Sequence, residues 1–135
     1  MSLINWSDNL SVNIKGLDNQ HKKLVNMINE LHDAMKQGKS STVLTKILFE
    51  MVAYTKIHFK SEEELFEKYN YPEKIKHKKE HDMFVQKVNE FMNEYKSGKT
   101  NLSFELMNFL TKWLTNHIQV SDKAYSSFLN NNGIY

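Results

Sequence analysis

Two histidines stand four residues apart in the lysine-rich stretch "EKIKHKKEH", at positions 77 and 81. Four residues along an α-helix fall about 40° short of a full set of turns, so His77 and His81 would project from one helical face. Two imidazoles on one face can bind a single metal ion. The spacing alone is weak evidence, because paired histidines also occur on ordinary solvated faces. A metal site would need further ligands elsewhere in the chain.

Three other histidines occupy positions that a bundle of antiparallel helices would bring to the same level. His21 opens the first long segment free of glycine and proline, His58 lies late in the second, and His117 lies late in the fourth. Glu62 follows His58 by four residues and would share its helical face. Counted from the chain turns at ~1.5 Å per residue, these side chains fall within about 3 to 5 Å of one level along the bundle.

Asp122 completes the set of candidate ligands in "HIQVSD", five residues after His117. Five residues correspond to about 140° around a regular α-helix, so the two side chains can face one point only if the helix changes course. Ser121 could cap a short final helix after a break near residues 119–121. The sequence therefore predicts a bend that turns the Asp122 carboxylate inward.

A metal centre is the simplest partner for five histidines and two carboxylates at one level. Each group alone could be a hydrogen-bonded core residue, and the other glutamates of "SEEE" are expected to be solvated. Unpaired buried ionisable groups cost several kcal/mol each, whereas a bound cation satisfies all of them together. The sixth histidine, His32, lies about 16 Å along the helix from His21 and is expected to be structural.

Seven ligands exceed the four that a structural zinc site uses, so two metal ions are expected. Glu62 and Asp122 could each bridge both ions through their two oxygens. The five imidazoles could then divide three and two. A set of imidazoles and carboxylates suits iron among the available metals.

The composition limits the classes of protein and of metal site. The chain has 135 residues, enough for one ordinary domain, and no cysteine, which excludes thiolate ligands, thiol nucleophiles and disulfides. Eighteen Lys and Arg against sixteen Asp and Glu give a net charge of +2 without a basic stripe, so no nucleic acid partner is indicated. With no signal peptide and no window apolar enough to span a bilayer, the expectation is a cytoplasmic protein without membrane contact.

An up-down-up-down bundle of four helices would position these side chains. The few helix breakers, Gly38, Pro72 and Gly98, leave four long segments with apolar residues at helical spacing. The prediction is one all-α domain over 1–135. It comprises an extended N-terminal arm (1–17), the four-helix bundle (18–118) and a bent C-terminal segment with a short helix (119–135). The predicted N-caps are Asp18, Ser40 or Ser41, and Asn101.

The chain resembles the hemerythrin family, particularly its single-domain bacterial members, in "DNQHKKL", "HFKSEEE", "HKKEH" and "WLTNHIQVSD". The resemblance runs from Trp6 to about Phe128 and implies two iron ions (Fe2+/Fe3+) with a bridging oxo or hydroxo group. It also implies the division of the ligands: His77, His81 and His117 on one iron, His21 and His58 on the other, which keeps an open position, with Glu62 and Asp122 as bridges.

The family binds dioxygen reversibly, which implies a non-enzymatic protein for oxygen delivery, storage or scavenging. The charge of the ligand set agrees: oxidase-type diiron sites use about four glutamates, and two carboxylates with five histidines should disfavour cleavage of the O–O bond. The resemblance further implies an apolar oxygen pocket, which would also be ordinary bundle core. Its residues are Leu24, Phe59, Trp113, Leu114 and Ile118.

Two other functional classes stay open at this point. A sensor of oxygen, redox state or nitric oxide would need an unidentified protein partner that detects movement of the terminal segment, and the lack of a fused signalling domain counts against it. An enzyme that consumes peroxide or nitric oxide would need a substrate cavity or proton relay, which the sequence does not indicate. A monomer is the favoured oligomeric state.

Overall fold

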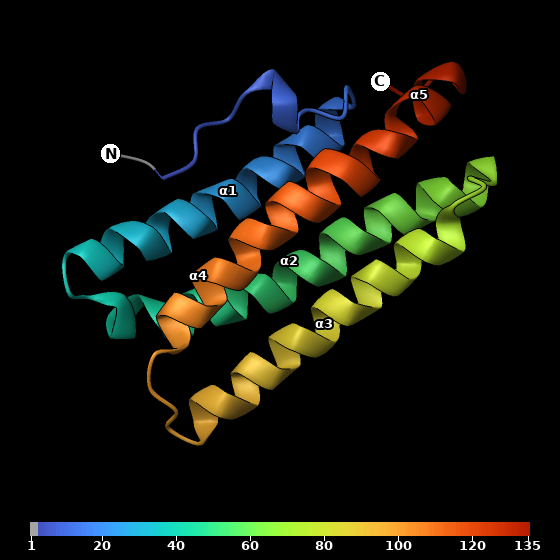
Figure 1. The fold of residues 1–135 in the computed structure, drawn as a ribbon. Coiled ribbons are helices and arrows are strands. Elements are labelled where there is room, and N and C mark those ends of the chain that lie inside the picture. Colours follow the sequence, from blue (N-terminus) through green and yellow to red (C-terminus); the bar gives the residue numbers. More distant parts are fainter. Residues whose placement is uncertain (1–2) are drawn as a thin grey trace.

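The computed structural model describes residues 3–135, which form helices with no strand among them. Each long helix runs antiparallel to the one before it, and α1 and α3 both pack on α2 and α4 (Figure 1). The predicted all-α, up-down-up-down bundle is confirmed. Within the described range, no helix combines the length and apolarity needed to cross a membrane. The four helices are α1 (Lys15–Lys36), α2 (Ser40–Tyr69), α3 (Lys74–Lys96) and α4 (Leu102–Trp113).

Helix α4 continues without interruption into a π-helix, η2 (Leu114–Asp122), and then into the short helix α5 (Lys123–Asn131). Backbone hydrogen bonds in a π-helix join residues five apart, so such residues return to nearly the same face. His117 and Asp122 have this spacing, and both are buried. The predicted change of course is confirmed. The predicted break is wrong, because Ser121 lies inside η2 and caps no helix.

The predicted helix starts are only partly correct. Helix α2 begins at Ser40 itself, so neither Ser40 nor Ser41 is its N-cap. Asn101 does occupy the N-cap position of α4, but its backbone is left-handed, with φ 63°, and its side chain makes no capping hydrogen bond. Helix α1 begins at Lys15, before the predicted cap Asp18, so the bundle starts earlier than expected.

Asp18 joins the N-terminal arm to α1 instead of capping the helix. Its carboxylate accepts hydrogen bonds from the Ser11 hydroxyl (2.6 Å) and from the backbone N–H of Val12 (2.8 Å). Val12 is fully buried, and the hydroxyl of Ser126 in α5 donates to its carbonyl oxygen (2.7 Å). The arm is therefore fixed to both the first and the last helix.

Two clusters of buried apolar side chains fill the bundle, one on each side of a polar layer. The larger cluster extends toward the α1–α2 and α3–α4 connections, and the smaller one lies beneath the arm and α5. In α1, Leu24 belongs to the larger cluster and Leu17 to the smaller, and a buried histidine lies between them. In α2, the buried Glu62 lies between Phe59 of the larger cluster and Phe66 of the smaller one. The polar layer is thus enclosed by apolar packing at both ends.

Replacing Asp18 by alanine should lower the free energy of unfolding by about 1–3 kcal/mol, because the Val12 N–H loses its acceptor. Urea unfolding followed by circular dichroism measures this. Asp8→Ala is the matched control, since Asp8 is exposed and its side chain forms no hydrogen bond with the described residues. Equal stability of the two variants would contradict the role assigned to Asp18.

Candidate metal centre

All seven predicted ligands lie together in the polar layer, and each is at most 2% exposed. By contrast, His32 is only partly buried and belongs to neither group of clustered side chains, as predicted. Helices α1, α2 and α3 contribute, and so does η2, the continuation of α4, because the layer crosses the bundle at one level. The candidate ligands are His21 from α1, His58 and Glu62 from α2, His77 and His81 from α3, and His117 and Asp122 from η2.

The ligand atoms form two overlapping groups, within each of which all atoms lie within 4.8 Å of one another. The first, called here the five-residue group, comprises Glu62, His77, His81, His117 and Asp122. The second, the four-residue group, comprises His21, His58, Glu62 and Asp122. Both carboxylates belong to both groups, so each can bind two metal ions at once. The four-residue group has one ligand fewer.

The contacts inside the centre suit metal ions better than hydrogen bonds. Asp122 Oδ1 lies 2.8 Å from His77 Nε2 and 2.9 Å from His117 Nε2, and Glu62 Oε1 lies 3.0 Å from His81 Nε2. None of these buried atoms is aligned for a hydrogen bond with any described residue. These nitrogen and oxygen atoms instead face the same small volume, as in a coordination shell. The donor set therefore fits two metal ions.

Three of the histidines are held from behind through the nitrogen that faces away from the centre. A hydrogen bond at Nδ1 fixes the ring orientation and leaves Nε2 free to bind a metal. The pairs are His81 Nδ1 with Glu63 Oε2 (2.9 Å), His117 Nδ1 with Glu80 Oε1 (3.2 Å), and His58 Nδ1 with Gln20 Oε1 (2.6 Å).

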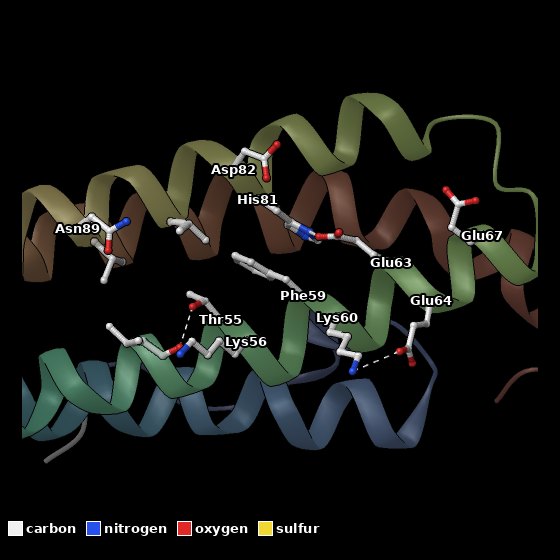
Figure 2. A pocket seen from close by; sticks show the side chains of 13 residues that line it. Thr55, Lys56, Phe59, Lys60, Glu63, Glu64, Glu67, His81, Asp82 and Asn89 are labelled. Carbon is white, nitrogen blue, oxygen red and sulfur yellow. Dashed lines mark hydrogen bonds and ion pairs between the residues drawn. The ribbon is translucent and has the colours of Figure 1, made fainter.

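These supporting side chains are not predicted from the sequence. The expectation that Glu63 of "SEEE" is solvated was wrong. Its side chain points at the His81 ring across the α2–α3 interface (Figure 2). Glu80 also receives a hydrogen bond from the Ser121 hydroxyl (2.8 Å), and hydrogen bonding by His117 holds its pKa below the usual range. Ligand spacing gives no signal for such residues, because only helix packing brings them to the ligands.

A buried tyrosine fixes one of the shared carboxylates. The Tyr125 hydroxyl donates a hydrogen bond of 2.5 Å to Glu62 Oε2 from helix α5. Burial raises the pKa of Tyr125 well above its ordinary value, so the hydroxyl stays protonated and remains a donor. This contact is not predicted from the sequence either, although α5 follows η2 directly.

Charge in the layer is balanced between histidines and carboxylates. Burial alone would lower the pKa of His77, but the proximity of Asp122 and Glu62 outweighs it and raises the pKa to about 10. The same balance raises the pKa of His21 to about 9. Burial would raise the pKa values of both carboxylates, but the surrounding histidines hold them low. Binding of a metal ion must therefore displace protons from His21 and His77.

The five residues predicted to form an apolar pocket lie beside the centre. Phe59 stacks on the His81 ring with centroids 3.8 Å apart, and Trp113 stacks on the His117 ring at 3.9 Å. Trp113 is partly buried and packs against the larger cluster, to which the other four belong. The buried members are Leu24, Phe59, Leu114 and Ile118, none more than 5% exposed.

Removal of metal by a chelator should make stability fall at alkaline pH. The raised pKa values of His21 and His77 mean that the folded chain holds protons which the unfolded chain releases near pH 6.5. This stabilisation is complete below pH 6.5 and is lost as the pH rises through about 9 to 10, on the order of 3 kcal/mol for one such histidine. Urea unfolding at pH 7 and pH 10 measures the loss. The metal-loaded protein is the control. If the metal-free protein loses no more stability between pH 7 and pH 10 than the metal-loaded protein does, this charge balance is contradicted.

The comparisons with known proteins agree with this geometry. Residues 12–129 match the family model of the hemerythrin HHE cation binding domain. The chain is 40% identical over 125 residues to the bacteriohemerythrin of Pseudomonas aeruginosa, covering 93% of this chain and 80% of that one. It is 33% identical to the bacteriohemerythrin of Methylococcus capsulatus, covering 96% and 98%. A crystal structure of wild-type hemerythrin superposes with a TM-score of 0.83 at 32% identity, covering 93% and 97%. The chain therefore belongs to the hemerythrin family.

Proposed function

We propose that this protein binds dioxygen reversibly at a centre of two iron ions, for delivery, storage or scavenging, without catalysing a reaction. The observation that carries the proposal is the overlap of the two ligand groups through Glu62 and Asp122, with one ligand fewer in the four-residue group. That deficit leaves room for an exogenous ligand beside His21 and His58. When bound, the two ferrous ions supply the two electrons that reversible dioxygen binding requires.

The protein side chains supply a nearly neutral, rigid environment for that chemistry. Five of the seven candidate ligands are imidazoles, which bind metal without adding charge, and two are carboxylates. Diiron sites that cleave dioxygen use more glutamates, whose charge supports strongly oxidised iron. The lower negative charge here supports binding over cleavage.

Apolar side chains on the larger cluster's side exclude water from the layer. Leu114 and Ile118 flank His117 on η2, and Phe59 follows His58 on α2, so these elements supply both ligands and apolar wall. These side chains would keep water, and the protons that it carries, away from iron bound in the layer. A dry wall therefore slows irreversible oxidation of the iron.

The absorption spectrum tests the proposal directly. Anaerobically reduced protein with about two irons per chain should gain visible bands in air and lose them again under vacuum, over repeated cycles. Glu62→Ala and Asp122→Ala should lose both iron and stability, because metal binding is coupled to folding. One zinc per chain, or irreversible bleaching with turnover of peroxide, would contradict the proposal, and the latter would indicate an enzyme.

Opening the apolar wall should accelerate oxidation of the oxygenated protein. Leu114→Ala or Ile118→Asn admits water beside the ligands while all seven remain in place. Stopped-flow mixing with oxygen, followed by decay of the adduct, gives the rate. Leu106→Ala is the matched control, because Leu106 is fully buried in the same cluster but lies about three helical turns from His117. Both leucine substitutions should lower the free energy of unfolding by about 2–5 kcal/mol, but the Leu106 cavity does not reach the centre. Decay at the parent rate in well-folded, iron-loaded variants would show that these residues are only core.

A further inference from the structure

The side chains that hold the histidines from behind differ in charge between the two ligand groups. In the five-residue group, Glu63 accepts from His81 and Glu80 accepts from His117. In the four-residue group, the corresponding acceptor is the amide oxygen of Gln20, which carries no charge. The asymmetry is built into the fold, because each acceptor comes from a different helix than the histidine it holds.

Both glutamates are fixed in place. Glu63 lies on the wall of a groove of about 840 Å³ between α2 and α3, with its carboxylate directed at the His81 ring (Figure 2). Its side chain is about one-third exposed, at 30%. Glu80 is similarly exposed, at 29%, and the Ser121 hydroxyl holds the same oxygen that accepts from His117. Their hydrogen bonds keep both carboxylates beside the histidine rings.

A carboxylate that accepts from the N–H of a metal-bound imidazole increases electron donation by the opposite nitrogen. It also places a full negative charge a few ångströms from the ion. Both effects stabilise Fe3+ relative to Fe2+. A neutral amide in the same position orients the ring but adds no charge. The two ions therefore experience different fields although they share both bridging carboxylates.

We propose that Glu63 and Glu80 are positioning residues that lower the reduction potential of the ion in the five-residue group. This ion is then the first of the two to be oxidised. An ion held by the four-residue group would be the harder of the two to oxidise. The inference rests on the proposed diiron centre and assigns unequal roles to its two halves.

Redox titration of the iron-loaded protein tests the inference. The protein is titrated anaerobically with dithionite and ferricyanide in the presence of mediators, so that one electron enters or leaves per Fe3+/Fe2+ couple, and the bands of oxidised iron are followed. Glu63→Gln and Glu80→Gln keep an acceptor of the same shape but remove the charge. Each should raise the equilibrium constant for reduction of the first-oxidised ion about tenfold, which corresponds to about 59 mV for a one-electron step.

Two further variants complete the design. Glu64→Gln is the matched control, because Glu64 neighbours Glu63 but is 68% exposed and its ion pair is with Lys60 on the surface. It should leave both potentials unchanged. Gln20→Glu introduces a charge behind His58 and should lower the potential of the other ion, which brings the two steps closer together.

Parental potentials in iron-loaded Glu63→Gln and Glu80→Gln would overturn the inference, since the carboxylates would then only orient the rings. If a glutamine variant fails to bind iron, the Gln20→Glu variant provides the test. Unchanged reduction potentials in iron-loaded Gln20→Glu would then overturn the inference. Failure of the proposed function is separately visible: shifted potentials in proteins that do not cycle reversibly in air would support this inference while refuting reversible oxygen binding.

Discussion

Two buried carboxylates shared among five buried imidazoles are the interaction on which the rest of this structure depends. Charged groups inside a bundle must find partners, since each unpaired one costs several kcal/mol. Glu62 and Asp122 therefore require histidines from α1, α2, α3 and η2 at one level, and this requirement constrains how the helices align along the bundle axis. The apolar clusters on both sides then pack against a layer whose position is already determined.

The π-helix η2 shows how strongly that constraint acts on the backbone. A regular α-helix cannot direct both His117 and Asp122 at one point, and the chain adopts a rarer hydrogen-bonding pattern over nine residues instead of breaking. Continuity has a benefit, because α5 remains in line and places the Tyr125 hydroxyl on Glu62. A break would have allowed Asp122 to turn inward but would not have fixed the direction of α5.

The sequence was sufficient to predict the bundle and the set of clustered side chains, because helical periodicity and residue spacing are local properties. It was not sufficient to predict Glu63 or Glu80, whose roles depend on which faces of neighbouring helices meet. Asp18 illustrates the opposite error: a good capping residue was assigned a local role, while a tertiary contact with the arm uses its carboxylate. The form of the helix irregularity was also missed, since a π-helix has no distinctive residue type whereas Ser121 suggested a cap.

The connections of the bundle lie at unequal distances from the centre. The α1–α2 and α3–α4 turns are at the end remote from the ligands, whereas the α2–α3 turn, α5 and the later part of the arm lie at the ligand-bearing end (Figure 1). Loops tolerate insertion where little packs on them. During divergence, the two remote turns, around Gly38 and Gly98, are therefore free to drift in length or accept an inserted module. The α2–α3 turn and the other segments near the ligands have less freedom to change. Loop length is therefore expected to vary among family members at the remote end of the bundle and to stay similar at the ligand-bearing end.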